Sequence, residues 1–207
     1  SSYTLLGLFP TPALSASMNQ MKKTNTCAIQ ITASHNQYYD NGLKFFDHLG
    51  DKINDSIQRQ IEHIVYSDSF DIKSIKKDNN TDKELSDIYI TFIRKYFSTK
   101  LSNFLPLNEK LNILVDCANG AFSKIIDRIF DNQNINIIPI NIEPDGKNIN
   151  LNCGATNPKQ ISDFINFFNS QKAKSSKNKS EILKLDLGIA IDGDGDRAIF
   201  VDNQGNI

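Results

Sequence analysis

The sequence has no long apolar run and almost no net charge. No stretch approaches the roughly 20 apolar residues of a membrane-spanning helix, so we expect no membrane as a partner. The 23 basic and 24 acidic residues give a net charge of -1, and no Lys/Arg-rich run or basic amphipathic helix stands out. Nucleic acid is therefore not expected as a partner either.

Cysteine is also scarce, and no export signal is visible in the opening residues. The three cysteines, Cys27, Cys117 and Cys153, are odd in number and far apart, so we expect reduced, buried thiols and neither a disulfide nor a Cys-x-x-Cys metal site. The opening S-S-Y-T-L-L-G has no basic region followed by an apolar one. We therefore expect a cytoplasmic protein.

The length and composition fit one large or two small globular domains. The chain has 207 residues, of which 39% are hydrophobic and 23% charged. A helix with a broad apolar face is predicted from about residue 82. That face comprises Leu85, Ile88, Tyr89, Phe92, Ile93, Tyr96 and Phe97. We expect the boundary at the start of this helix, which gives a first domain of residues 1–84 and a second of residues 85–207.

The first domain is predicted to contain both strands and helices. The motif G-L-F-P-T-P (residues 7–12) ends a strand and begins a helix, because proline suits the first helical turn. Residues 27–32 and 43–47 are predicted strands of one sheet, joined by the polar loop 33–42. The apolar residues of the first helix, expected in the core, are Leu14, Met18 and Met21. A further helix has its cap at Asn54 or Asp55 and its apolar residues at Ile53, Ile57, Ile61 and Ile64. Residues 67–82 are expected to form a surface connection.

The second domain alternates strands and helices. Strands are predicted at residues 111–116 and 135–140, with a helix at about 121–130 between them. A further helix carries Ile161, Phe164, Ile165 and Phe168, and another strand follows it. This order is typical of an α/β unit with crossover helices. Residues 172–180 lack an apolar anchor and are expected to be a mobile insertion.

Three carboxylates alternate with glycine in the run I-A-I-D-G-D-G-D-R-A-I-F-V-D (residues 189–202). The acids are Asp192, Asp194 and Asp196, and the apolar flanks predict a loop between two strands. Hard divalent cations such as Mg²⁺ prefer oxygen ligands, and glycine allows the sharp curvature that brings the acids together. The sequence therefore predicts a Mg²⁺ site in this loop.

The acidic loop has two other possible interpretations. A calcium-binding helix-loop-helix needs Gly at its sixth position and Glu at its twelfth, where this chain has Arg197 and Asn203. An acidic hairpin turn that binds nothing is the simpler alternative. However, three carboxylates held together without a cation repel one another, which favours the metal site.

A second polar group lies in the loop T-A-S-H-N (residues 32–36). Ser34 beside His35 suggests nucleophilic catalysis, but neighbours in an extended loop tend to point apart, and no G-x-S-x-G elbow surrounds the serine. A phosphate on Ser34 would instead add oxygen ligands for a cation held by the aspartates. Arg197 and Lys44 would supply positive charge and a proton-transfer group. The alternative for Lys44 is an ordinary solvated strand residue.

Taken in order, these motifs resemble the α-D-phosphohexomutase family. T-A-S-H-N with Y-Y-D-N-G-L-K is similar to that family's phosphoserine loop, and D-G-D-G-D-R is similar to its Mg²⁺ loop. G-L-F-P-T-P, V-D-C-A-N-G-A, E-P-D-G-K-N-I-N and C-G-A-T follow the order expected of its bacterial members that act on glucosamine phosphates. The resemblance implies a fold of two three-layer α/β domains with mixed sheets.

The resemblance also implies an activity and residue roles. Phosphorylated Ser34 would exchange its phosphoryl group with a hexosamine phosphate through a bisphosphate intermediate, which interconverts the 6-phosphate and the 1-phosphate. Mg²⁺ would bind Ser34, Asp192, Asp194 and Asp196. By similarity, Lys44 is the general acid/base, Arg197 contacts a phosphate and His35 supports the serine loop. Oligomeric state is left open, including a homodimer.

This chain departs from the family pattern in two ways. The usual S-H-N-P reads S-H-N-Q, with Gln37 in place of a loop proline. The chain also matches only the middle of the pattern, truncated at both ends, without the early F-G-T-D-G-x-R-G motif or the later sugar- and phosphate-binding domains. By itself it is not expected to turn over substrate, because positioning supplies much of the rate. The competing functions are a mutase of glucose or mannose phosphates, a metal- or phosphate-binding module without catalysis, and a metal-dependent phosphatase.

Overall fold

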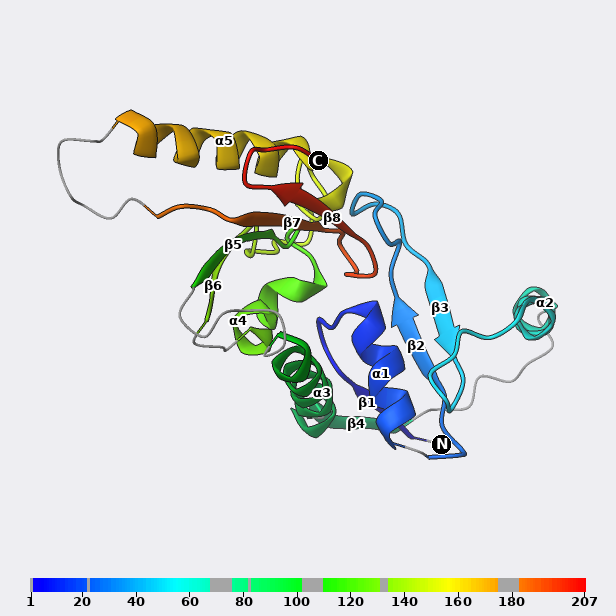
Figure 1. Ribbon diagram of the computed structural model, residues 1–207. Coiled ribbons are helices and arrows are strands. Elements are labelled where there is room, and N and C mark those ends of the chain that lie inside the picture. Colours follow the sequence, from blue (N-terminus) through cyan, green and yellow to red (C-terminus); the bar gives the residue numbers. More distant parts are fainter. Residues whose placement is uncertain are drawn as a thin grey trace.

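A computed structural model describes most of the chain. The described residues are 2–21, 23–67, 76–81, 83–101, 110–130, 134–174 and 183–207. They form two regions that meet at the acidic loop (Figure 1). Within them, no helix is long and apolar enough to cross a membrane.

The second half contains a four-stranded mixed sheet with strand order β6-β5-β7-β8. The strands are β5 (Leu111–Asp116), β6 (Ile135–Ile140), β7 (Leu187–Ile191) and β8 (Ala198–Asp202). β5 pairs in parallel with β6 and β7, whereas β8 runs antiparallel to β7. The predicted α/β fold with a mixed sheet is therefore confirmed.

Helices cover both faces of this sheet, because successive strand residues point to opposite sides. On one face, Leu114 packs with Ile161 and Ile165 of α5 (Lys159–Lys174). On the other, Ile113 and Val115 pack with Ile126 of α4 (Ile126–Ile129). Figure 1 shows α5 above the sheet and α4 below it, a three-layer arrangement. The layers hold the carboxyl ends of β5 and β7 at one edge, where the acidic loop begins.

The first half contains two separate pairs of strands around one helix. β2 (Ala28–Ile31) and β3 (Leu43–Phe46) are antiparallel, which confirms that the polar loop joins two strands of one sheet. β1 (Ser2–Leu5) pairs in parallel with β4 (Lys76–Thr81). α1 (Thr11–Met21) packs Leu14 and Met18 against Ala28 and Phe46.

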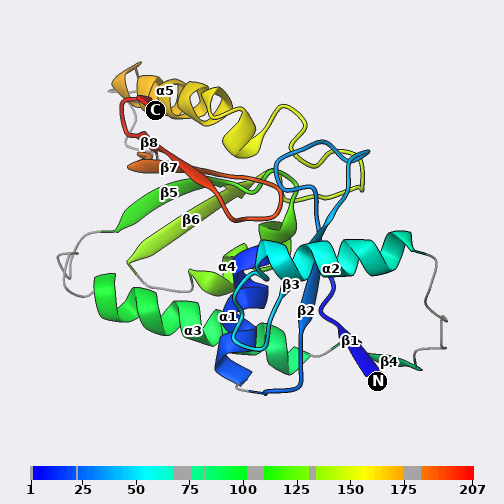
Figure 2. The ribbon, with the colours of Figure 1, turned by 90° about the vertical axis from the view of Figure 1, so that its right-hand side faces the viewer.

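The two halves share a hydrophobic cluster along α3 (Lys83–Leu101). Tyr89 and Ile90 of α3 pack with Phe9 and Ala13 of the first half and with Ile125 and Ile129 of the second. Figure 2 shows α3 beside α1 and beneath the sheet. The helix that begins the predicted second domain is thus packed against the first. The predicted boundary at residue 84 remains a proposal.

Several local predictions were wrong. Residues 76–81 form β4 rather than a surface connection, because pairing with β1 overrides the low strand preference of K-K-D-N-N-T. The predicted helix at 121–130 is split into η1 (Ala121–Lys124) and α4, because Ile125 leaves helical geometry at φ -125° and ψ -10°. Lys172–Lys174 belong to α5, and the rest of the predicted insertion lies outside the described residues.

Several apolar residues and one cysteine singled out from the sequence are on the surface. Cys27 is exposed, although all three cysteines are free as expected. Phe92 and Tyr96 on α3, and Phe164 and Phe168 on α5, are exposed because their helices bury only a narrow face. In α2 (Asp55–Tyr66), which Asn54 caps as predicted, no residue is buried.

Candidate functional site

The acidic loop brings its three carboxylates together. Asp192, Asp194 and Asp196 each offer an oxygen, and these oxygens all lie within 4.8 Å of one another. Asp192 and Asp194 are buried, whereas Asp196 is exposed. The loop connects β7 to β8, as the sequence predicted.

Backbone hydrogen bonds and a glycine shape this loop. Asp192 Oδ1 accepts hydrogen bonds from the backbone N–H groups of Asp196 and Arg197, both at 3.1 Å. Gly195 has φ +75°, and a Cβ there would lie 2.3 Å from the ring of Phe122. Only glycine fits both the left-handed backbone and the close packing. The backbone therefore turns at Gly195, whose N–H donates to Asp192 O at 3.0 Å.

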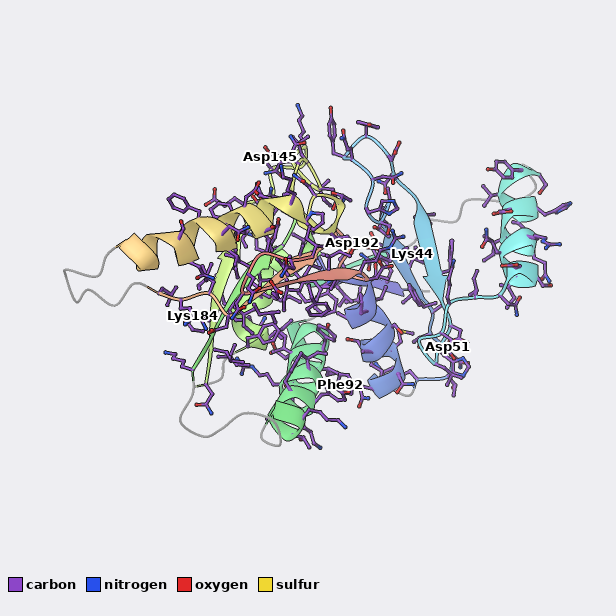
Figure 3. The ribbon with its side chains drawn as sticks, turned by 45° about the horizontal axis from the view of Figure 1, so that its top comes forward. Lys44, Asp51, Phe92, Asp145, Lys184 and Asp192 are labelled. Carbon is purple, nitrogen blue, oxygen red and sulfur yellow. The ribbon has the colours of Figure 1, made fainter. Side chains whose placement is uncertain are left out.

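Residues from the first half reach this loop. Lys44 of β3 places Nζ 2.7 Å from Asp194 Oδ2 and 2.9 Å from Asp196 Oδ2. Thr11, the first residue of α1, donates from Oγ1 to Asp194 Oδ2 at 2.8 Å and from its backbone N–H to Asp194 O at 2.9 Å. In Figure 3, Lys44 reaches from its strand toward the loop that carries Asp192. The solvated alternative for Lys44 is wrong.

Burial and charge move the pKa values of these groups in different directions. Burial raises the pKa of Asp192, and the nearby Asp194 and Asp196 add to this shift against the hydrogen bond from Arg197. Burial alone would also raise the pKa of Asp194, but hydrogen bonds from Lys44, Thr11 and Thr32 outweigh it and hold that pKa below its usual value. Burial lowers the pKa of Lys44, but its two carboxylate partners outweigh burial and raise it overall. Lys44 is therefore charged at neutral pH.

The serine loop lies next to the acidic loop. Ser34 has φ +58°, an unusual conformation for a residue other than glycine, and its Oγ is buried without a hydrogen-bond partner among the described residues. Its backbone N–H donates to Thr32 Oγ1 at 2.8 Å, and the Thr32 side chain in turn lowers the pKa of Asp194. One threonine thus connects the backbone of Ser34 with a carboxylate of the acidic loop.

The remaining predicted site residues lie at the rim. The side chain of Arg197 is 56% exposed, with Nε 3.7 Å from Asp196 Oδ1 and 4.0 Å from Asp192 Oδ2. His35 is exposed. The structure therefore groups Lys44, Arg197 and the three aspartates, places Ser34 beside them and leaves His35 on the surface.

The donor set suits a hard divalent cation. Asp192 Oδ2 and Asp194 Oδ1 are buried without a hydrogen-bond partner among the described residues. Buried carboxylate oxygens are normally satisfied, and oxygen ligands are those that Mg²⁺ prefers. The Lys44 ammonium already contacts two of the three carboxylates, which shows that this loop attracts positive charge. The residues fit a Mg²⁺ ion.

Sequence reasoning missed three contacts of the site: Thr11, Thr32 and Asn150. Asn150 donates from Nδ2 to the backbone oxygens of Ser34 and Asn36. For Thr11 a local signal exists, since the first N–H groups of a helix are free to meet an anion. Thr32 begins the T-A-S-H-N motif and Asn150 ends the E-P-D-G-K-N-I-N motif, but neither motif by itself indicates which loop these side chains contact.

Comparison with known proteins gives two family matches. Residues 2–71 match the model described as phosphoglucomutase/phosphomannomutase, alpha/beta/alpha domain I. Residues 87–205 match the model described as phosphoglucomutase/phosphomannomutase, alpha/beta/alpha domain II.

Curated relatives match almost the whole chain but are much longer. A phosphoglucosamine mutase of Campylobacter curvus (strain 525.92) is 35% identical over 207 residues, which covers 98% of this chain and 42% of the relative. Another from Limosilactobacillus reuteri subsp. reuteri (strain JCM 1112) is 35% identical over 211 residues, covering 98% and 40%. The chain thus spans about two fifths of their length.

Solved structures share the fold. A phosphoglucomutase/phosphomannomutase family protein from Burkholderia thailandensis has a TM-score of 0.64 at 22% identity, covering 95% of this chain and 39% of that one. An N-acetylglucosamine-phosphate mutase of the alpha-D-phosphohexomutase superfamily, in a substrate complex, has a TM-score of 0.54 at 20% identity, covering 93% and 47%. At these identities the likeness concerns the fold alone.

Proposed function

The chain belongs to the phosphoglucomutase/phosphomannomutase family, and from this we propose that it is part of a phosphoglucosamine mutase. The complete enzyme would interconvert glucosamine 6-phosphate and glucosamine 1-phosphate. The choice of sugar is supported by the names of the curated relatives, each about 35% identical to this chain. The hexosamine phosphate is the partner that this function requires.

Ser34 would carry the phosphoryl group that is exchanged. A hydroxyl oxygen of the bound sugar phosphate attacks the phosphorus and loses its proton, the bond from phosphorus to Ser34 Oγ breaks, and Ser34 Oγ gains a proton. A sugar bisphosphate and a free Ser34 hydroxyl form. The bisphosphate returns its other phosphoryl group to Ser34 Oγ, which leaves the isomeric monophosphate and restores the phosphoserine. No net phosphate is consumed, so the overall reaction is an isomerisation.

Asp192, Asp194 and Asp196 would hold Mg²⁺ beside Ser34. When bound, the ion supplies positive charge that stabilises the transferring phosphoryl group. The buried, partnerless oxygens of Asp192 and Asp194 support this assignment. A phosphate oxygen of Ser34 is the proposed fourth ligand.

Lys44 would serve as the general acid/base, and Arg197 as a phosphate contact. The raised pKa of Lys44 keeps it in the acid form, which can give a proton to the oxygen that leaves phosphorus. The exposed guanidinium of Arg197 can bind a phosphate with two hydrogen bonds. His35 would act only through the conformation of the serine loop.

One observation carries the proposal: the serine loop, Lys44 and the acidic loop meet at Asp194. Lys44 lies 150 positions from Asp194 in sequence and contacts it directly. Thr32, two residues before Ser34, lowers the pKa of the same aspartate. A metal loop without a transfer function would need neither a lysine nor a serine loop at this point.

The test uses the full-length protein and its Ser34→Ala variant. We expect intact-mass analysis to show one phosphate on the wild type and none on the variant, and mutase activity to fall to background in the variant. Rates with glucosamine, glucose and mannose 6-phosphates decide the sugar. Preference for a sugar without an amino group would contradict the glucosamine assignment, and net release of phosphate without need of Ser34 would indicate a phosphatase.

A further inference from the structure

The side chain of Asn150 joins the two halves of the chain at the serine loop. Its Nδ2 donates to the backbone oxygen of Asn36 at 2.9 Å and to that of Ser34 at 3.3 Å. Ser34 and Asn150 are 116 positions apart in sequence. Figures 1 and 2 both show the loop between β2 and β3 beside the loop that follows β6. Two carbonyl groups of the serine loop are therefore held by one amide from the second half.

The same amide also lies against the acidic loop. A Cβ on Gly193, which separates Asp192 from Asp194, would come within 2.5 Å of Asn150 Nδ2. Asn150 is thus in contact with the backbone of one loop and hydrogen-bonded to the backbone of the other. Its side chain sets how closely the two loops approach.

Asn150 is anchored in its own half of the protein. It is 5% exposed, its backbone N–H donates to Ala118 O at 3.0 Å, and its carbonyl oxygen accepts from Thr156 Oγ1 at 3.4 Å. Its φ of +56° lies in the left-handed region, which asparagine enters more readily than most residues. The amide therefore extends from a fixed backbone.

The chemistry at this position requires a donor. Turning the amide over would place Oδ1 against two carbonyl oxygens, so the Nδ2 orientation is the one that the neighbours select. Oδ1 is buried without a partner among the described residues. An aspartate of the same shape would offer only acceptors to the serine loop.

We propose that Asn150 is a positioning residue, whose amide holds Ser34 against the acidic loop for phosphoryl transfer. We call the two hydrogen bonds from Asn150 Nδ2 to the serine loop the clamp. The role in transfer rests on the proposed mutase function, whereas the clamp does not. Phosphoryl transfer depends on placing the phosphorus between its partners, and small displacements are costly. The clamp supplies that placement from the domain that also holds the acids.

Hydrogen exchange in the 207-residue chain tests the clamp. We expect Asn150→Ala to speed amide exchange in residues 32–42 by roughly tenfold, because two hydrogen bonds are lost, while the strands β5 and β7 keep their protection. Asn150→Asp should speed exchange in residues 32–42 at least as much, because its carboxylate offers no donor to the two carbonyl oxygens. If the side chain only filled space, Asn150→Asp would exchange like the wild type, and that result would overturn the proposal.

Asn152→Ala is the matched control. Asn152 lies in the same loop and has nearly the same φ, +55°, but it is exposed. Its substitution creates the same left-handed alanine without removing a contact to the serine loop. Equal acceleration in both variants would attribute the effect to backbone strain and contradict the clamp.

Kinetics of the full-length enzyme test the positioning role. We expect Asn150→Ala to lower kcat by about 10- to 100-fold with little change in KM, because the sugar phosphate still binds while Ser34 is misplaced. An unchanged kcat despite faster loop exchange would overturn the positioning role. A wild-type enzyme without mutase activity would instead refute the proposed function, and the exchange result would still decide the clamp.

Discussion

The acidic loop and the serine loop carry the two parts of the proposed chemistry, but they are built differently. The acidic loop closes on itself, since Asp192 accepts two backbone N–H groups from within five residues. It also follows β7 of a sheet covered on both faces. The serine loop follows β2 and precedes β3, where Ile31 is 66% and Leu43 is 59% exposed.

This difference shows which part of the site is formed in advance. A loop at the end of a buried sheet inherits the stability of the core, so its carboxylates are held together before any ligand binds. A loop on an exposed two-stranded ribbon depends on contacts from elsewhere, because such a ribbon is marginal alone. Here those contacts come from Asn150 and, through Lys44 and Thr32, from Asp194.

Thiol labelling should give the largest difference between the two regions. Cys27, beside β2, is exposed, whereas burial raises the pKa of Cys117, after β5, to about 12 and that of Cys153 to about 11. At pH 8 we expect Cys27 to react with a thiol reagent more than about a thousandfold faster than either buried thiol. Mass spectrometry of the labelled peptides measures the ratio. Similar rates would mean that the second region opens as easily as the first.

The same thiols predict a loss of stability at alkaline pH. In the unfolded chain a cysteine ionises near its ordinary value of about 8.5, while Cys117 in the folded state stays protonated. Burial of the protonated Cys117 thiol therefore contributes fully to the free energy of unfolding below about pH 8.5, and this contribution is lost as the pH rises toward about 12. Cys117→Ala should flatten the decline in the free energy of unfolding between pH 8.5 and 10, measured with urea; Cys27→Ala, as the control, should not.

Asp194→Asn should have the next largest effect, on the preformed part of the site. Asp194 is buried and offers one of the three carboxylates, so its loss should weaken Mg²⁺ binding by about 100-fold. Isothermal titration of the 207-residue chain measures this affinity. Asp186→Asn serves as the control, because Asp186 lies before β7 and outside the cluster. Unchanged Mg²⁺ binding in Asp194→Asn would remove the metal assignment.

Gly193→Ala should disturb the contact between the two regions. The added methyl group would meet Asn150 Nδ2 at 2.5 Å and Ile149 Cδ1 at 2.8 Å. We expect a loss of roughly 1–3 kcal/mol in the free energy of unfolding, as for other overpacked sites. Urea denaturation checks this value. Gly146→Ala is the comparison for an added Cβ in open space, since nothing lies within 4 Å of it, although its φ of +86° adds backbone strain.

Gln37→Pro should have the smallest effect and acts only on the serine loop. No described hydrogen bond uses the backbone N–H of Gln37, so a proline there removes none. If the native φ of Gln37 is compatible with proline, the substitution should stabilise the folded chain by about 0.4–1 kcal/mol. The reason is that proline lowers the conformational entropy of the unfolded chain. Thermal unfolding and exchange in residues 32–42 measure the change. A destabilised variant would show that the backbone at this position differs from that of the related S-H-N-P loops.

Most of the elements and the chemistry of the acidic loop follow from local sequence patterns. Periodicity gave the strands at 111–116 and 135–140 with the bounds that the structure has, because buried parallel strands are short, continuous apolar runs. The spacing of Asp192, Asp194 and Asp196 was sufficient to predict their convergence, since two glycines and three acids within five residues leave few alternatives. Sequence patterns predict these features because the residues that form them are close together in the chain.

How the serine loop is held and which apolar faces are covered depend on contacts between distant parts of the chain. The contacts of Asp194 with Lys44 and Thr11 span 150 and 183 positions, and that of Asn150 with Ser34 spans 116. Local periodicity does not predict such pairs, because the two partners are far apart in the sequence and meet only in the folded chain. Likewise, α2 has a regular apolar pattern, yet no residue of it is buried. Burial depends on what packs against a helix, and the helix alone does not specify its neighbour.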